Sequence, residues 1–201
     1  AMEQQNISAP IVYHGGPMHE PSAAQKTIEQ VLALAPVAKR VGAQLLNFNP
    51  APKKGRAPKS SAELAVQAQA VERLASELRP QGLELILHHH DVELQHGARE
   101  WRHLLEHTQR HLCLDLMWIA RGGQAPLKLL RAAGTRLASL HVRNMQGGVC
   151  TEALEDGDID YRKVASYLSE IHFQGWIVLE LFYEAGTRLT RPLPENLRRS
   201  R

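Results

Sequence analysis

The chain has 201 residues, of which 43% are hydrophobic and 22% are charged, so it can bury one core and is expected to form a single domain over residues 1–201. A net charge of +3 is too small to argue for a nucleic-acid partner. With no apolar run near 18 residues, no charged leader and only two cysteines, we expect no membrane span, no signal peptide and a reducing, cytoplasmic location.

Apolar runs and helical patterns alternate along the chain. Ser60 and Glu63 have the spacing of a capping box, which predicts a helix that starts there and stops before Pro80. The other boundaries follow from glycines, prolines and apolar periodicity. The expected strands are residues 11–14, 44–49, 83–87, 112–115, 137–141 and 176–180. The expected helices are residues 22–41, 60–78, 98–108, 125–133 and 161–173, with loops at 50–59 and 144–157.

This alternation of strands and helices predicts an α/β fold with a parallel sheet. An open, doubly wound sheet usually has a glycine-rich turn after its first strand. Gly15-Gly16-Pro17 lacks that spacing, and Pro17 would block the helix N-terminus where a phosphate binds. A closed (β/α)8 barrel takes about 250 residues. We therefore expect a (β/α) TIM barrel truncated to six βα units.

Four expected strands end in a side chain that can bind a metal: His88, Asp115, His141 and Glu180. About 27 residues separate the first two and about 26 the next two, which is the length of one βα unit. Parallel strands bring their C-terminal ends to one edge, so the four side chains are expected to gather there. Imidazole and carboxylate groups suit a divalent metal cation such as Mn, Zn, Co or Mg.

Five short motifs, in this order along residues 11–182, resemble the xylose isomerase-like TIM-barrel family of sugar isomerases and epimerases, which includes inosose dehydratases and ketose 3-epimerases. On this alignment the chain begins near the family's third strand, so the family's first two strands are absent. The motifs are His88-His89-His90-Asp91-Val92-Glu93, Cys113-Leu114-Asp115-Leu116-Met117-Trp118, Leu140-His141-Val142-Arg143-Asn144, Gly157-Asp158-Ile159-Asp160 and Val178-Leu179-Glu180.

Three positions depart from the family pattern. Many members have a glutamate at the end of strand five, which the resemblance implies is both a metal ligand and an acid/base, whereas this chain has His88. Glu93 could take that role if the turn after His88 folds inward. Arg143 replaces a usual lysine, and Asn144 replaces a usual aspartate and cannot act as a general base. The departures concern proton transfer more than metal binding.

Each site residue also has a structural interpretation. Residues 88–90 could be a surface tract, and strand alternation places His88 and His90 on one face and His89 on the other. Asp115 could cap the following turn, and Glu180 could pair with Arg143. His141 alone would more often be a core histidine. His14 and Trp118, at or after strand ends, either line a sugar pocket or pack in the core.

A divalent cation bound to a hydroxyl and the adjacent carbonyl of a sugar acidifies the C–H between them, and a nearby base can then move the proton. The expected function is therefore sugar isomerisation, epimerisation or dehydration. The expected ligands are His88, Asp115, His141 and Glu180; the acid/base groups are His90, Glu93 and Glu180; and the substrate contacts are His14, Trp118 and Arg143.

Two other functions stay open: a binding or vestigial barrel, and a metal-dependent nuclease resembling endonuclease IV. No glycine-rich dinucleotide fingerprint follows an expected strand, so no nucleotide cofactor is expected. The expected partner is a small sugar or polyol, with no nucleic acid and no membrane. The unpaired edges of the strands at 11–14 and 176–180 predict a homo-oligomer.

Overall fold

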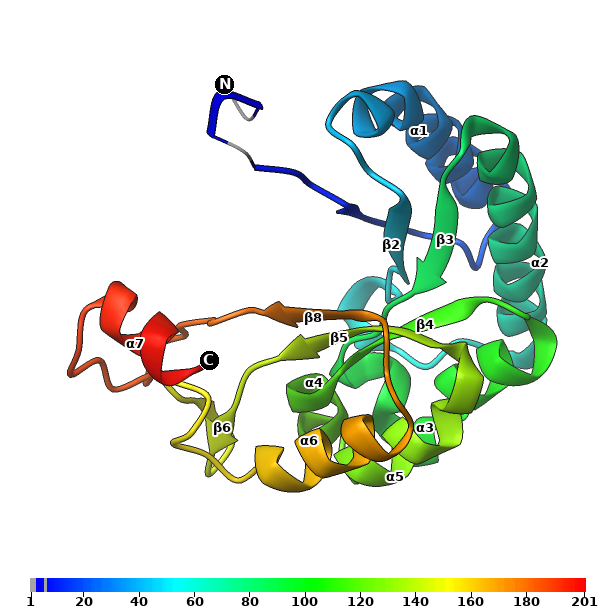
Figure 1. The fold of residues 1–201 in the computed structure, drawn as a ribbon. Coiled ribbons are helices and arrows are strands. Elements are labelled where there is room, and N and C mark those ends of the chain that lie inside the picture. The colour runs from blue at the N-terminus through cyan, green and yellow to red at the C-terminus, as the bar shows by residue number, and fades with distance from the viewer. Residues whose placement is uncertain (1–2, 6) are drawn as a thin grey trace. The chain divides into compact units, whose positions relative to one another are not determined.

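A computed structural model describes residues 3–5 and 7–201. The chain divides into two compact units, Ala1–His111 and Leu112–Arg201. The first contains the parallel strands β1, β2 and β3 in that order, and the second the parallel strands β4, β5 and β8 (Figure 1). Within the described residues, no helix combines the length and apolar character needed to cross a membrane.

The elements of the first unit are η1 (Glu3–Gln5), β1 (Ile11–Gly16), α1 (Pro21–Arg40), β2 (Leu45–Pro50), η2 (Lys54–Arg56), α2 (Ser61–Leu78), η3 (Arg79–Gln81), β3 (Glu84–Leu87) and α3 (Asp91–His107). The core lies between the strands and the helices α1 and α2, where Ile28, Phe48, Leu74 and Ile86 are buried. Burial of each such side chain stabilises the fold by about 1.5–3 kcal/mol.

The capping box predicted at the start of α2 is confirmed. The Ser60 hydroxyl accepts the backbone N–H of Glu63 at 3.2 Å, and the Glu63 carboxylate accepts the backbone N–H of Ser60 at 2.6 Å. These two bonds satisfy N–H groups that have no partner within the helix. The helix therefore begins where the sequence indicates and ends at Leu78.

Helix α3 begins earlier than the predicted residues 98–108 and contains a break. It starts at Asp91, where the Glu93 carboxylate accepts the backbone N–H of His90 at 2.8 Å. Helical dihedrals stop at residues 95–98, and φ is +52°, +68° and +59° at His96, Gly97 and Ala98. The predicted start at Ala98 therefore marks the second half of the helix. The part of α3 before the break is only about one turn long, and a segment this short shows no 3.6-residue apolar period from which a helix could be predicted.

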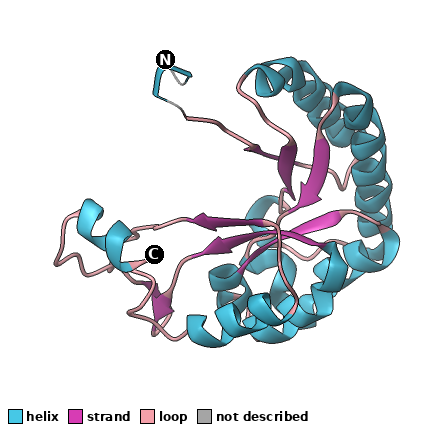
Figure 2. Cartoon of the chain, viewed as in Figure 1, coloured by secondary structure: helices cyan, strands magenta, loops and turns pink. Residues whose placement is uncertain are grey.

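The elements of the second unit are β4 (His111–Asp115), α4 (Leu116–Arg121), α5 (Pro126–Ala133), η4 (Gly134–Arg136), β5 (Leu137–Val142), β6 (Met145–Gln146), β7 (Val149–Cys150), α6 (Tyr161–Glu170), β8 (Trp176–Leu179) and α7 (Leu193–Arg199). Helices α4, α5 and α6 lie along one side of its strands (Figure 2). The elements of this unit that were not predicted are α4, η4, the small antiparallel hairpin of β6 and β7 inside the expected loop, and α7.

Asn144 organises the segment that links β5 to α6. Its buried side-chain amide donates to the carbonyls of Leu154 (2.7 Å) and Ile159 (3.1 Å), and its Oδ1 accepts the backbone N–H groups of Met145 (2.9 Å) and Ile159 (3.0 Å). Gly157 packs against this amide so closely that a Cβ would lie 2.3 Å from the Asn144 Cγ. The position that replaces the family's usual aspartate therefore has a structural function here.

Candidate active site

Three of the four predicted metal ligands meet in the second unit. Asp115 ends β4 opposite His141 of β5, and His141 lies opposite Val178 of β8. Glu180 follows β8, where its backbone N–H donates to the Val142 carbonyl at 3.1 Å. One ligand-capable atom from each of Asp115, His141 and Glu180 lies within 4.8 Å of the other two. The parallel register of β4, β5 and β8 brings these side chains together at the C-terminal ends of the strands.

Arg143 links the two carboxylates of this cluster. Its Nη2 donates to the Asp115 Oδ2 at 2.5 Å, and its Nη1 donates to the Glu180 Oε1 at 3.1 Å. Asp115 is fully buried and Arg143 is 4% exposed, whereas the Glu180 side chain is 41% exposed. Such charge-assisted bonds are strong, and a buried carboxylate without one would cost free energy. The sequence expectation that Glu180 pairs with Arg143 is therefore met, and Asp115 joins the pair.

Aromatic side chains fix the position of Arg143. Its guanidinium carbon lies 5.0 Å from the centre of the Trp118 ring and 5.5 Å from that of Phe182, which are cation–π distances. The Tyr161 hydroxyl donates to the Arg143 carbonyl at 2.6 Å and accepts its backbone N–H at 3.1 Å. Burial raises the pKa of Tyr161, so this hydroxyl stays protonated. Both the backbone and the side chain of Arg143 are thus held.

His141 and Asp115 have shifted pKa values. Burial lowers the pKa of His141, but hydrogen bonds with Cys113 and Glu180 outweigh it and raise the pKa to about 10. The His141 Nδ1 lies 2.8 Å from the Glu180 Oε2 and 4.0 Å from the Asp115 Oδ2. Burial also raises the pKa of Asp115, opposed by the Arg143 charge and by the Trp118 N–H, which donates to its Oδ1 at 2.9 Å. The same bond makes Asp115 the N-cap of α4, as its structural interpretation predicted.

Two carboxylates and one imidazole are a donor set that fits a divalent cation. Two features of the cluster oppose binding. Arg143 already pairs with Asp115 and Glu180, and a histidine must be neutral to ligate, whereas the pKa of His141 is raised to about 10. A cation held by these residues would therefore displace the Arg143 guanidinium and release a proton from His141.

Sequence reasoning missed Cys113, Tyr161 and Phe182 as members of this site. Cys113 stands two residues before Asp115 on β4, so its side chain lies on the same face of the strand, and this spacing is a signal that the sequence offers. Tyr161 and Phe182 reach Arg143 from the start of α6 and from the segment after β8. Nothing in the local sequence around either residue indicates these contacts.

The remaining predicted site residues belong to the first unit. The buried His88 follows β3, with its ring centre 5.1 Å from that of His90 and 5.7 Å from that of Tyr13. The His89 ring packs on Trp101 at 4.7 Å. The ring centre of His88 is also 5.7 Å from that of His89, and both residues are buried, so these contacts do not separate the two faces expected from strand alternation.

Two other predicted residues of this unit, His14 and Glu93, have packing and capping contacts. The His14 ring is parallel to Phe48, with ring centres 6.5 Å apart. Glu93 is buried, and its carboxylate accepts the backbone N–H of His90 at the start of α3. Burial raises the pKa of Glu93, opposed by this bond. Capping is therefore the contact that the structure gives Glu93.

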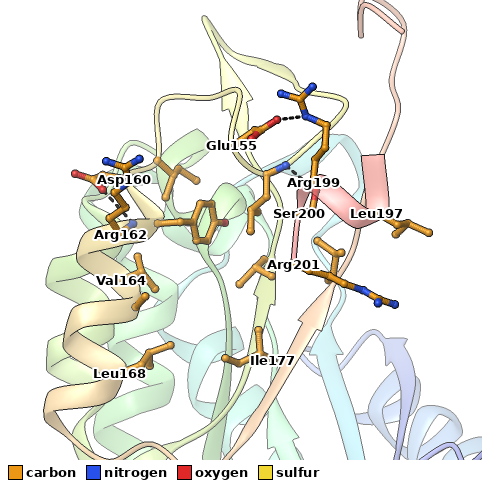
Figure 3. A pocket seen from close by; sticks show the side chains of 16 residues that line it. Glu155, Asp160, Arg162, Val164, Leu168, Ile177, Leu197, Arg199, Ser200 and Arg201 are labelled. Atoms are coloured by element: carbon orange, nitrogen blue, oxygen red, sulfur yellow. Dashed lines mark hydrogen bonds and ion pairs between the residues drawn. The ribbon is translucent and has the colours of Figure 1, made fainter. Parts of the chain in front are cut away.

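A separate cavity of about 1020 Å³ lies in the second unit between α6, β8 and α7 (Figure 3). Apolar side chains such as Val164, Leu168 and Ile177 form much of its wall, and Glu155 and Arg199 form an ion pair at its rim. Ile177 on β8 is 56% exposed. Polar residues such as Asp160, Arg162 and Ser200 also line this cavity, but none of the predicted metal ligands does, so the cluster around Arg143 is the better candidate for an active site.

Residues 1–201 match the family model of xylose isomerase-like TIM barrels. An inosose dehydratase from Clostridium tetani (strain Massachusetts / E88) is 21% identical over 134 residues, which cover 56% of this chain and 45% of that protein. The match therefore spans less than half the length of this curated relative.

Three solved structures have a similar fold. A sugar phosphate isomerase/epimerase from Parabacteroides distasonis ATCC 8503 has a TM-score of 0.77 at 16% identity, over 98% of this chain and 70% of that one. D-allulose 3-epimerase from Methylomonas sp. has a TM-score of 0.76 at 21% identity, over 100% and 72%. The 3-keto-D-glucoside 4-epimerase from E. coli has a TM-score of 0.75 at 13% identity, over 98% and 80%. The predicted α/β TIM-barrel fold with six βα units is confirmed.

Proposed function

Because this chain belongs to the xylose isomerase-like TIM-barrel family, we propose that it is a sugar isomerase or epimerase that moves a proton next to the carbonyl of a keto-sugar or polyol-derived substrate. The observation that carries the proposal is the meeting of Asp115, His141 and Glu180 at adjacent strand ends, with ligand-capable atoms within 4.8 Å. The names of the relatives, among them epimerases and a dehydratase, support this class of reaction.

In this proposal Asp115, His141 and Glu180 hold a divalent cation, which when bound polarises a carbonyl and acidifies the adjacent C–H. Glu180 is the one carboxylate of the three ligands that is open to solvent, so it is the group that can reach a substrate proton. Arg143 donates to a substrate oxygen once it leaves the carboxylates, and Trp118 offers a ring face for the sugar. The roles expected from the sequence for His14, His88, His90 and Glu93 stay predictions, as does the cytoplasmic location.

One observation favours a second function, a sugar-binding protein that uses no metal. Arg143 pairs with both carboxylates and, together with protonated His141, balances their charge, so the cluster is complete as an ion-pair network. A buried arginine with fixed donors can bind sugar hydroxyls without any cation. Metal binding and proton exchange separate the two functions.

The experiment combines metal analysis with proton exchange. The purified chain is loaded with Mn²⁺, and keto-sugars are incubated with it in deuterated water. We expect one ion per chain and deuterium at the carbon next to the carbonyl, and we expect Asp115→Asn to abolish both. Asp158→Asn, an exposed aspartate of the same unit, is the matched control and should leave both unchanged. If the chain binds metal but no keto-sugar gains deuterium, the proposed isomerase or epimerase activity is contradicted. If the chain binds no metal, the sugar-binding function is the one that remains.

The homo-oligomer expected from the sequence is also part of the proposal. Among the described residues, β1 pairs only with β2, and β8 pairs only with β5. Tyr13 on β1 and Trp176 on β8 are exposed apolar side chains on these strands. A second copy that pairs with either strand would satisfy its free edge.

A further inference from the structure

A small basic cavity lies in the first unit, between the loop from β2 to α2 and the broken helix α3. Its volume is about 60 Å³. The charged side chains that line it are Lys53, Arg56, Lys59, Arg99 and Glu100, so four cations face one carboxylate. None of these residues was assigned a function from the sequence.

In the part of the chain that the structure describes, three of the four cations have a carboxylate partner and Arg99 has none. Among the described residues no carboxylate lies within 4.0 Å of its guanidinium. Its Nη1 donates to the Lys59 carbonyl at 2.6 Å, and its Nη2 donates to the Ser61 hydroxyl at 3.1 Å. These neutral acceptors orient the guanidinium without neutralising it. The paired cations are Lys53 with Glu63 (2.6 Å), Arg56 with Asp91 (2.5 Å) and Lys59 with Glu100 (2.6 Å).

Lys59 shows that the cavity wall is an ordered part of the protein. Its side chain is 1% exposed, and its Nζ donates to the Gln67 Oε1 at 2.7 Å as well as to Glu100. Gln67 in turn donates to the same Glu100 oxygen at 3.0 Å. A buried ammonium is costly unless its donors are satisfied, so this network fixes a cation at the wall. Burial and the Lys59 charge also lower the pKa of the neighbouring His19.

The backbone beside the cavity is strained. His96 lines the cavity, and it and Ala98 have positive φ values of +52° and +59°, which L-residues with a side chain rarely adopt. Strain of this kind persists where the surrounding structure fixes it, and it is common at binding sites. The break of α3 at residues 95–98 therefore lies at the rim of the cavity.

We propose that this cavity binds a phosphate-sized oxyanion, either free phosphate or the phosphate group of a sugar ester. The volume accommodates one such group and not a whole sugar. Arg99 uses two of its five N–H groups on Lys59 and Ser61, which leaves three N–H donors on an unneutralised guanidinium for the oxygens of a phosphate. Lys53 and Lys59 line the same cavity, but their charges are compensated by Glu63 and Glu100, so Arg99 supplies the charge that an anion would neutralise. This site lies within the first unit, and its existence does not depend on the proposed enzymatic function.

The test is isothermal titration of the full chain with inorganic phosphate at low ionic strength. We expect saturable binding that Arg99→Met weakens by about tenfold or more, which corresponds to the loss of charged hydrogen bonds. Arg99→Lys keeps the positive charge but loses the planar guanidinium, so its affinity for phosphate should lie between those of the parent and Arg99→Met. Arg110→Met is the matched control, because Arg110 is in the same unit, pairs with Glu72 at 3.0 Å and lies outside this cavity. It should bind phosphate like the parent.

Thermal unfolding gives a second readout that does not require activity. Phosphate should raise the melting temperature of the parent and of Arg110→Met, and leave that of Arg99→Met unchanged. A ketose phosphate that binds at least tenfold more tightly than phosphate would identify a sugar ester as the ligand, and equal binding would identify free phosphate. Absence of phosphate binding by the parent, or equal losses in Arg99→Met and Arg110→Met, would overturn the proposal.

Discussion

Replacing Arg143 by methionine tests whether its guanidinium and a divalent cation compete for the same carboxylates. The variant keeps much of the side-chain volume between Trp118 and Phe182 and removes the charge. Asp115 is fully buried and would lose its 2.5 Å bond, and breaking a buried pair in this way costs about 3–5 kcal/mol of unfolding free energy. Without metal, the variant should therefore be much less stable than the parent.

Mn²⁺ should reverse this loss. A ligand that binds only the folded state stabilises it by about 2.7 kcal/mol at one hundred times its dissociation constant. Because Arg143→Met removes one of the two positive charges of the cluster and leaves only His141 beside the two carboxylates, it should bind Mn²⁺ more tightly than the parent and gain more stability from it. The measurement is urea unfolding of both proteins, with and without Mn²⁺.

Arg121→Met is the matched control for this experiment. Arg121 pairs with Glu184 at 2.6 Å in the same unit, but both side chains are partly exposed. Its loss should cost less stability, and Mn²⁺ should not restore it. If Mn²⁺ stabilises the parent and Arg143→Met equally, the guanidinium and the cation do not compete for the carboxylates. If Mn²⁺ stabilises neither protein, there is no metal site at Asp115.

Two further changes test the structure of the second unit. Gly157→Ala should lower the unfolding free energy by about 1–3 kcal/mol, because a Cβ would meet the Asn144 amide at 2.3 Å; an unchanged urea midpoint would contradict this packing. Hydrogen bonds from Arg121 and from the Cys150 N–H lower the pKa of Glu184 from 4.5 to about 2, so Glu184 stabilises the fold above pH 4.5 and the stabilisation is lost as pH falls towards 2. Glu184→Gln should therefore flatten the loss of stability between pH 4.5 and 2 in acid titrations followed by circular dichroism.

The fold and part of the site followed from sequence because both depend on periodicity. Once apolar runs recur at the spacing of a βα unit, parallel register places Asp115 beside His141 and brings Glu180 to the same edge. The break in α3 did not follow, because the left-handed run at residues 96–98 depends on tertiary contacts and contains only one glycine. The role of Glu93 as a cap could have been found, since it stands three residues after the N-cap His90.

The bond between Arg143 and Asp115 is a part of the site that could not be predicted from the sequence. The spacing of two residues between His141 and Arg143 predicts the same strand face, and the sequence offered both a pairing with Glu180 and a contact with substrate. The bond to Asp115 depends on how far the guanidinium extends between two strands. That reach is set by Trp118 and Phe182, which come from other segments. Side-chain reach across strands is a tertiary property.

The charge of the cluster couples metal binding to the position of Arg143. Asp115 and Glu180 carry two negative charges, and Arg143 and protonated His141 carry two positive charges, so the cluster is neutral as it stands. A divalent cation added to it would leave two uncompensated positive charges in a largely buried site, which is unfavourable. Metal binding therefore requires that His141 lose its proton and that Arg143 leave the carboxylates. The Arg143 backbone is fixed by Tyr161, so a displaced guanidinium would stay near the site, where we propose that it donates to a substrate oxygen.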